Sequence, residues 1–261
     1  METIKLKING IEVTAPKGST ILEAARLAHI EIPTLCFLKE INEIGACRVC
    51  IVELKNGKLV TSCVYPAEDG MEVFTNTPKV MDSRKKTIQL LLSNHNRSCL
   101  SCVRSGHCEL QELARELGVE DEGYYDGETT PSEIDTSAAH MIRDNSKCIL
   151  CRRCVAVCSE VQGIGVIGAN NRGFATEIGS AFGMGLGETS CVSCGQCIAV
   201  CPTGALQEKD CTSEVFAAIA DPSKHVIVQT APAVRAALGE EFGLPIGTNV
   251  EGKMAAALRR I

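Results

Sequence analysis

The chain has 261 residues with a net charge of −6, 16 cysteines, no tryptophan and only 3% aromatic residues. This composition argues against one large apolar core and favours several small units held together by disulfides or metals. The acidic charge, without a basic stripe, excludes a typical nucleic-acid partner, and no run of 18 apolar residues is present that could span a membrane.

The first predicted elements are a strand pair within residues 3–14 and a helix over ILEAARLA. The strands turn at Asn9-Gly10, because both residues tolerate the positive φ that a tight hairpin needs. Ser19-Thr20 is the expected helix cap. Strand, strand and helix, followed by a loop that carries cysteines, indicate a small α+β unit.

Two further helices are predicted over residues 78–95 and 109–117. The first, PKVMDSRKKTIQLLLSNH, begins at a proline, where the missing N–H costs least. The acidic run at 116–128, ELGVEDEGYYDGE, is typical of a linker or an exposed loop.

An internal repeat follows: CILCRRCVAVCSE from Cys148 and CVSCGQCIAVCPT from Cys191 share the pattern C-x2-C-x2-C-x3-C, 43 residues apart. Bacterial ferredoxins hold two [4Fe–4S] clusters with this pattern, and the fourth cysteine of each run binds the other cluster. The rule assigns Cys148, Cys151, Cys154 and Cys201 to one cluster, and Cys191, Cys194, Cys197 and Cys158 to the other. A zinc ribbon is the alternative, although it normally uses two C-x2-C pairs without a third cysteine.

Between the two runs, GIGVIG (Gly163–Gly168) matches the dinucleotide-binding pattern G-x-G-x-x-G. That fingerprint requires a strand before it and a helix opening from it. Here a cysteine run precedes it, and the ANNRGFATEIG that follows favours a hairpin, so nucleotide binding is not expected.

After the repeat, Cys211 has no neighbouring thiol and is expected to be a small buried apolar residue. Residues 224–232, KHVIVQTAP, predict a strand, and AVRAALGEEFG predicts a helix closed by Gly243.

Disulfides are the ordinary explanation of so many cysteines, but they need an oxidising compartment that is normally reached through a secretory signal. The first 18 residues, METIKLKINGIEVTAPKG, lack the apolar core of such a signal. We therefore expect a cytoplasmic protein whose cysteines bind metal.

Two more cysteine sets precede the repeat. The first set is Cys36, Cys47, Cys50 and Cys63. Its spacing matches the plant-type [2Fe–2S] pattern C-x4-C-x2-C only in part, because the first gap is ten residues, and zinc stays open. The second set has three cysteines, Cys99, Cys102 and Cys108.

The five histidines are the candidates for a fourth ligand of the second set. His95 is favoured because it lies four positions before Cys99 at the end of a helix, whereas His107 adjoins Cys108, and neighbours rarely reach one metal. A zinc site of three cysteines and one histidine, or a plain helix-terminal histidine, remains the alternative. His29, His140 and His225 are expected to be surface or packing residues.

Together these motifs resemble the N-terminal electron-relay region of the multi-cluster [FeFe] hydrogenases, found in catalytic subunits of NAD(P)-linked and electron-bifurcating hydrogenases. IPTLCFLKEINEIGACRVCIVE with TSCVYP is similar to the family's β-grasp [2Fe–2S] domain, and SNHNRSCLSCVRSGHCELQELA to its [4Fe–4S] domain with one histidine and three cysteine ligands. CILCRRCVAVC and CVSCGQCIAVCPTGAL resemble its two-cluster ferredoxin domain, and VIVQTAPAVRAALGEEFG the first strand and helix of its catalytic domain.

The resemblance implies an α+β chain with one [2Fe–2S] and three [4Fe–4S] clusters, in which His95 is the fourth ligand beside Cys99, Cys102 and Cys108. Four parts are expected: a β-grasp [2Fe–2S] domain, a small helical [4Fe–4S] domain, a two-[4Fe–4S] ferredoxin-like domain and the start of an α/β catalytic domain. Their expected residues are 1–78, 79–138, 139–210 and 211–261.

The family binds its active-site cluster, the H-cluster, through cysteines well beyond this point, and this chain has none after Cys211. We therefore expect a truncated portion of a longer oxidoreductase, with the H-cluster only in the missing C-terminal part. The implied function is single-electron transfer between the hydrogen-activating site and flavin/NAD(P)-binding subunits, small iron–sulfur subunits or ferredoxin. The alternatives are the large iron–sulfur subunit of complex I, an NAD-linked formate dehydrogenase, and a non-catalytic electron carrier.

Overall fold

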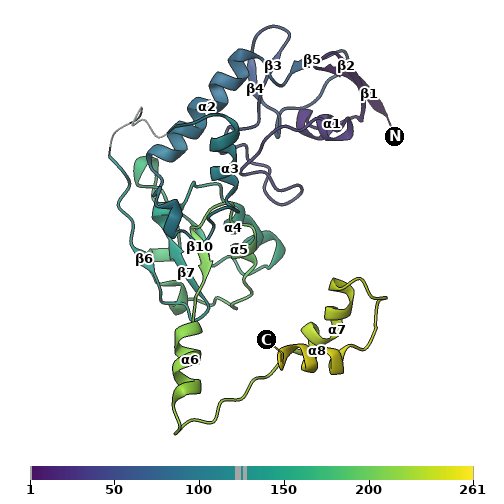
Figure 1. The fold of residues 1–261 in the computed structure, drawn as a ribbon. Helices are drawn as coiled ribbons and strands as arrows, with labels where there is room; N and C mark the ends of the chain where they lie inside the picture. Colours follow the sequence, from purple (N-terminus) through teal and green to yellow (C-terminus); the bar gives the residue numbers. More distant parts are fainter. Residues whose placement is uncertain (1, 121–124, 126–127, 261) are drawn as a thin grey trace. The chain divides into compact units, whose positions relative to one another are not determined.

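The computed structural model describes residues 2–120, 125 and 128–260. The chain divides into two compact units, Met1–Lys209 and Asp210–Ile261 (Figure 1). In the described residues, no helix is both long enough and apolar enough to cross a membrane.

A mixed five-stranded sheet forms the beginning of the first unit. Its strands, in spatial order, are β2 (Ile11–Pro16), β1 (Thr3–Ile8), β5 (Glu72–Phe74), β3 (Ile51–Leu54) and β4 (Leu59–Thr61). Strand β1 is parallel to β5 and antiparallel to β2, and β3 is antiparallel to both of its neighbours. The β3–β4 hairpin thereby places Cys50 at its start and Cys63 just after its end.

The predicted N-terminal hairpin and helix are confirmed. Asn9 and Gly10 have φ of 52° and 82°, as the tight turn requires. Helix α1 (Ile21–Leu27) begins with a reciprocal cap: the Thr20 hydroxyl accepts the Glu23 backbone N–H at 3.2 Å, and the Glu23 carboxylate accepts the Thr20 N–H at 2.9 Å. The buried face of α1 packs on the sheet through Ile21, Leu22, Ala24 and Ala25.

Strands β3, β4 and β5 were not predicted from the sequence. They are only four, three and three residues long, so they show too little alternation for a period-2 pattern to be recognised. Their stability comes from pairing and burial, since Val52, Val60 and Val73 lie in the same apolar core as α1.

Helices α2 (Pro78–Ser93) and α3 (Glu109–Glu116) confirm the next two predicted helices. Helix α2 starts at its proline, with the Thr77 hydroxyl accepting a backbone N–H of the first turn. The Arg84 guanidinium is buried and donates to the Ile51 carbonyl oxygen in β3 at 2.7 Å, which ties α2 to the first sheet. Of the predicted acidic linker, residues 121–124 and 126–127 lie outside the described residues.

The two cysteine runs fold into the same backbone turn. Helices α4 (Arg153–Ala156) and α5 (Gln196–Ala199) begin 43 residues apart, at equivalent places in the repeat. The residues of left-handed conformation are equivalent too: Leu150, Arg152, Ser193 and Gly195. Because non-glycine residues rarely adopt positive φ, its recurrence at equivalent positions shows that the two runs share one backbone conformation.

Short strands surround the repeat. An antiparallel sheet has the order β10 (Leu206–Glu208), β7 (Met141–Asp144) and β6 (Ile134–Asp135), and β8 (Gly168–Asn170) pairs with β9 (Glu177–Gly179). The β8–β9 pair confirms the hairpin predicted after Gly168. The Gly163–Gly168 motif follows a π-helical turn, Val157–Val161, and leads into a strand, which is the reverse of the dinucleotide fingerprint.

The second unit consists of α6 (Thr212–Ala220), α7 (Pro232–Glu241), α8 (Glu251–Leu258) and connecting loops. Helix α7 is the predicted helix, and Gly243 follows it with φ of 72°. The strand predicted at 224–232 is wrong, because these residues belong to no strand in the described structure. An extended segment forms a strand only when a neighbouring strand completes its backbone hydrogen bonds. The pattern of apolar residues does not show whether such a neighbour is present.

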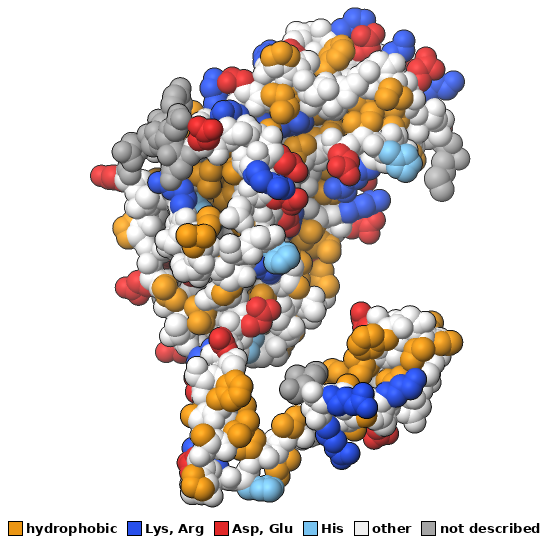
Figure 2. All heavy atoms as spheres, in the orientation of Figure 1, with side chains coloured by type: hydrophobic (Ala, Val, Ile, Leu, Met, Phe, Trp, Pro, Cys, Tyr) orange, Lys and Arg blue, Asp and Glu red, His pale blue; other side chains and the backbone are white. Residues whose placement is uncertain are grey.

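The prediction that Cys211 is buried is also wrong, since Cys211 is exposed and stands at the N-cap of α6. Apolar side chains gather along the surface of α6 (Figure 2), where Val215, Phe216 and Ile219 are exposed. A cysteine without a partner was therefore a poor indicator of burial here.

An ion pair joins α3 to α4 in the first unit. The buried Arg153 guanidinium donates two parallel hydrogen bonds to the Glu109 carboxylate, at 2.6 and 2.9 Å. We expect Glu109→Ala to lower the free energy of unfolding by about 2–3 kcal/mol in urea denaturation, because it leaves a buried guanidinium unpaired. Asp82→Ala, which breaks the exposed pair with Lys86, should cost about 0.5 kcal/mol or less. Equal losses in the two variants would contradict this role of Arg153.

Candidate iron–sulfur sites

The first set of predicted ligands lies in the loops around the β3–β4 hairpin. All four cysteines are buried: Cys36, Cys47, Cys50 and Cys63. The Cys47 backbone N–H donates to the Cys36 sulfur at 3.5 Å. Gly45 has φ of 61°, a conformation that favours glycine, and a Cβ there would stand 3.2 Å from the Val64 side chain. The loop therefore brings a backbone N–H close to sulfur.

These four cysteines form two pairs. The interaction between the Cys36 and Cys47 side chains lowers the pKa of Cys47 and raises that of Cys36. The interaction between Cys50 and Cys63 likewise lowers the pKa of Cys50 and raises that of Cys63. Binding of metal by these cysteines would displace the thiol protons of both pairs.

The second set comes together around the N-terminus of α3. Cys108 is the N-cap of α3, and Cys99 begins the short 3-10 turn that ends before Cys102. Burial raises the pKa of the Cys108 thiol, and the nearby charges of Cys102 and Cys99 raise it further. Backbone N–H groups of the first turn of α3 lower this pKa and so oppose the effect of burial. The structure therefore places the three thiols within electrostatic reach of one another.

His95 lies just beyond the C-terminus of α2. Its Nδ1 atom is buried and has no hydrogen-bond partner among the described residues, which is uncommon for a native polar group. Burial, and then the charge of Lys147, lower the pKa of His95, so the ring is held neutral, the form that binds metal. His107, by contrast, is exposed.

The repeated cysteines line two separate small cavities. The first cavity contains Cys148, Cys151, Cys154 and Cys201. The second contains Cys158, Cys191, Cys194 and Cys197. Each cavity therefore takes three cysteines from one run and the fourth from the other, the same crossed grouping that the spacing predicts for cluster ligands.

Burial controls the protonation of the repeated cysteines. It raises the pKa of Cys148 to about 11, that of Cys151 to about 12 and that of Cys197 to about 11. Without a metal these thiols would stay neutral at pH 7. Binding of metal by thiolates at these sites must therefore release protons, and its affinity must rise with pH.

One buried side chain connects the first set to the repeat. The Asn42 amide donates to the Cys36 carbonyl oxygen at 2.6 Å and to the Cys151 carbonyl oxygen at 3.0 Å. Asn42 is 3% exposed, and its backbone is held by two hydrogen bonds with Leu38. Ligand loops that are 115 residues apart are thereby joined through one amide group.

A second connection joins the histidine-containing set to the cavity of Cys148, Cys151, Cys154 and Cys201. The Glu109 backbone N–H, next to Cys108, donates to the carbonyl oxygen of Pro202, next to Cys201, at 3.1 Å. Two residues further on, Gly204 leaves room for the Cys102 sulfur, which would lie 2.6 Å from a Cβ at that position. Neither Asn42 nor Gly204 was singled out from the sequence, because each acts only through residues that are distant along the chain.

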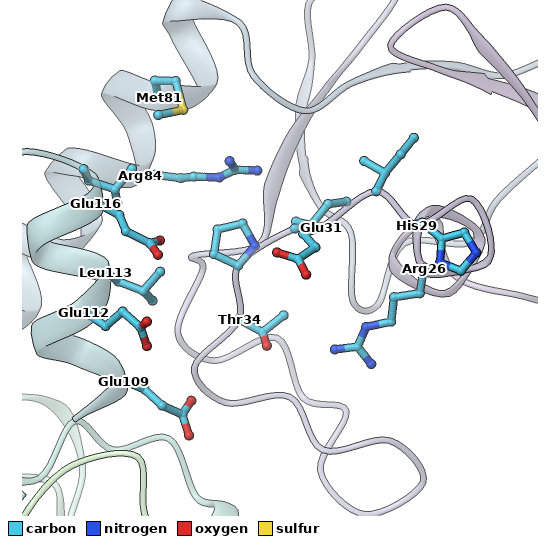
Figure 3. A pocket seen from close by; sticks show the side chains of 14 residues that line it. Arg26, His29, Glu31, Thr34, Met81, Arg84, Glu109, Glu112, Leu113 and Glu116 are labelled. Atoms are coloured by element: carbon cyan, nitrogen blue, oxygen red, sulfur yellow. The ribbon is translucent and has the colours of Figure 1, made fainter. Parts of the chain in front are cut away.

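A groove lies between α2, α3 and the loop that follows α1. Figure 3 shows the carboxylates of Glu109, Glu112 and Glu116 on α3 opposite Glu31 and Arg26. None of the predicted ligands lines it, so the groove is separate from the cysteine sites.

Comparison with protein families divides the chain in the same order as its motifs. Residues 1–78 match a 2Fe-2S iron-sulfur cluster binding domain, and residues 84–122 match the NADH-ubiquinone oxidoreductase-G iron-sulfur binding region. Residues 147–205 match a 4Fe-4S dicluster domain, and residues 224–261 match the C-terminal domain of the iron only hydrogenase large subunit.

Individual proteins give the same result. The chain is 49% identical over 267 residues to the NADP-reducing hydrogenase subunit HndD of Solidesulfovibrio fructosivorans, covering 100% of this chain and 46% of that protein. It is 37% identical over 255 residues to iron hydrogenase 1 of Clostridium pasteurianum, covering 97% of this chain and 44% of that protein. The chain thus spans less than half the length of these relatives.

Among solved structures, the NAD+-reducing [NiFe]-hydrogenase in its H2-reduced state superposes with a TM-score of 0.74 and 31% identity, covering 79% of this chain and 87% of that one. The mitochondrial NADH dehydrogenase [ubiquinone] iron-sulfur protein 1 of Solanum tuberosum is 36% identical, but it covers only 69% of this chain and 24% of its own length.

The fold and these matches define an iron–sulfur protein with a 2Fe–2S domain followed by 4Fe–4S domains. The chain belongs to the [FeFe] hydrogenase family and corresponds to the N-terminal iron–sulfur region of its large subunit, continuing into the first residues of the C-terminal domain. The resemblance seen in the sequence motifs is thereby confirmed.

The contact at Gly204 gives a test of the second connection. Gly204→Ala would force the Cys102 sulfur away from its place, and we expect the variant to lose about four iron atoms per chain, one [4Fe–4S] cluster, after anaerobic reconstitution. Gly168→Ala is the matched control, because no atom lies within 4 Å of a Cβ at that position. Full iron content in the Gly204→Ala protein would show that the contact does not position Cys102.

Proposed function

We propose that this chain is the electron-relay part of an [FeFe] hydrogenase. It would carry single electrons between redox partners and a hydrogen-activating site, for which the chain itself offers no cysteine after Cys211. The partners that we infer are NAD(P)-linked flavin subunits, small iron–sulfur subunits and ferredoxin. One observation carries the proposal: cysteines of three separate ligand sets pack into a single apolar core, namely Cys36, Cys47, Cys108 and Cys151.

The donor sets fit the clusters that we propose. A β-grasp [2Fe–2S] domain would use the two thiol pairs, Cys36 with Cys47 and Cys50 with Cys63, because each iron of such a cluster takes two ligands. Each of the two cavities contains four cysteines, which fits the four ligands of a [4Fe–4S] cluster. A zinc ribbon explains these cysteines poorly, because it normally uses two C-x2-C pairs without a third cysteine. When bound, these clusters would supply reversible one-electron chemistry.

His95 fits the remaining position, as the fourth ligand of a third [4Fe–4S] cluster with Cys99, Cys102 and Cys108. Its buried, unpartnered nitrogen and its lowered pKa favour a metal ligand over a helix-terminal histidine, which would be charged and exposed. The protein's own contribution is to hold the ligands in position and to exclude water, since potentials depend on exposure and on hydrogen bonds to sulfur.

The shared core supports a relay rather than four independent sites. Its apolar members include Leu35, Ile88 and Leu110, all fully buried, and each contributes about 1.5–3 kcal/mol by leaving water. Because the ligands of three sets belong to this core, their mutual distances are fixed by packing. A complex I subunit is the weaker assignment, because residues 224–261 match the iron only hydrogenase domain.

Iron content tests the number of clusters. We expect about 14 iron atoms per chain after anaerobic reconstitution, from one [2Fe–2S] and three [4Fe–4S] clusters. The measurement is iron and acid-labile sulfide analysis, with zinc measured in the same samples. A stable product with fewer than about 12 irons, or with zinc in place of iron, would rule out the four-cluster assignment.

Exchange of the histidine ligand tests His95. His95→Cys should keep a [4Fe–4S] cluster but lower its reduction potential, because a thiolate adds negative charge that disfavours the reduced state. His107→Ala is the control: His107 is exposed, so its removal should leave that potential unchanged. EPR-monitored redox titration measures both variants, and a shift confined to His107→Ala would reverse the assignment.

A further inference from the structure

His140 is a half-buried histidine that the proposed relay does not yet use. It immediately precedes β7, and its backbone carbonyl oxygen accepts the Lys209 N–H at 3.0 Å. Both ring nitrogens, Nδ1 and Nε2, are buried without a hydrogen-bond partner among the described residues. The sequence suggested a surface or packing histidine, but a packing histidine normally satisfies at least one ring nitrogen.

The surroundings of His140 show which groups lie near its ring. The residue lines the cavity that contains Cys158, Cys191, Cys194 and Cys197. The next residue along the chain, Met141, places its sulfur 4.0 Å from the Cys197 sulfur, so the start of β7 lies directly against this site. The cavity is also lined by Gln162 and Gln196, but neither of their amide groups forms a hydrogen bond with the ring. Its four cysteine sulfurs are the acceptors that would gain negative charge when a cluster binds.

The chemistry of imidazole makes the unsatisfied group a donor. In either protonation state the ring carries at least one N–H, and leaving a buried donor unpaired costs about 1–3 kcal/mol. Neutral thiols are weak acceptors, whereas the thiolate and sulfide atoms of a bound cluster carry negative charge and accept more strongly.

We propose that His140 donates a ring N–H to a sulfur of the [4Fe–4S] cluster held by Cys158, Cys191, Cys194 and Cys197, and thereby raises the reduction potential of that cluster. The inference rests on the proposed function for the presence of the cluster. The reduced cluster holds one more electron than the oxidised one, so an N–H dipole directed at sulfur stabilises the reduced state more; the proton stays on the ring.

The other cavity of the repeat is built differently. There the Thr203 hydroxyl lies 3.8 Å from the Cys201 sulfur and donates to the Lys147 carbonyl oxygen at 2.7 Å, so its proton is already used. The two cavities thus share a backbone turn but differ in the donor presented to sulfur. The His140 donor therefore belongs to one of the two cavities only.

The test uses the full chain with its clusters reconstituted. In His140→Phe a planar aromatic ring is kept and the N–H is lost, so the reduced-to-oxidised ratio of this cluster at a fixed potential should fall about tenfold, equivalent to about 59 mV for a one-electron couple. His140→Gln, which retains an N–H donor, should recover part of the shift. His225→Phe, at an exposed position in the second unit, should leave the potential unchanged.

A second measurement needs no variant. With 15N-histidine in the wild-type protein, pulsed EPR of the reduced sample should detect a weakly coupled histidine nitrogen at this cluster, besides the directly bound nitrogen of His95. A wild-type protein that holds the cluster but shows no such coupling, or an unchanged potential in His140→Phe, would overturn this inference alone. Absence of the cluster signal itself would instead overturn the proposed function, and this inference with it.

Discussion

The arrangement depends on one apolar core in which the ligand loops of three cysteine sets meet. Cys36 and Cys47 enter it from the first set, Cys108 from the histidine-containing set and Cys151 from the repeat. Apolar packing has no direction of its own, so it brings the loops together without fixing their register. Register is set by the polar contacts around the core, such as those of Asn42 and Glu109.

Two of these contacts join the first set and the histidine-containing set to the same cavity, that of Cys148, Cys151, Cys154 and Cys201. The Asn42 amide joins the carbonyl oxygens of Cys36 and Cys151, and the Glu109 backbone N–H reaches the Pro202 carbonyl oxygen beside Cys201. The site of Cys148, Cys151, Cys154 and Cys201 is therefore joined both to the first set and to the histidine-containing set. If the proposed clusters occupy these sites, this connectivity gives a branched relay. Electrons from the [2Fe–2S] cluster and from the histidine-ligated cluster would converge at this site before they reach the cluster of Cys158, Cys191, Cys194 and Cys197.

Sequence reasoning succeeded where structure follows from local spacing. The hairpin at Asn9-Gly10, the Thr20 cap and helix α2 all depend on residues close in the chain, and the repeated pattern foretold which cysteines share a cavity. It failed where tertiary context decides: the three-residue strands β4 and β5, residues 224–232 and the exposed Cys211. Asn42, Gly204 and His140 act only through residues that are distant in sequence, so no local pattern could have identified them.

The central claim is that four iron–sulfur clusters occupy these ligand sets and that the cluster of Cys148, Cys151, Cys154 and Cys201 lies between the others. A crystal structure of the reconstituted chain, with anomalous scattering recorded at the iron edge, tests it most directly. We expect four iron sites, with the cluster of this cavity next to both the [2Fe–2S] and the histidine-ligated cluster. Single metal ions in the cavities, or an iron cluster without His95 beside Cys99, Cys102 and Cys108, would contradict it.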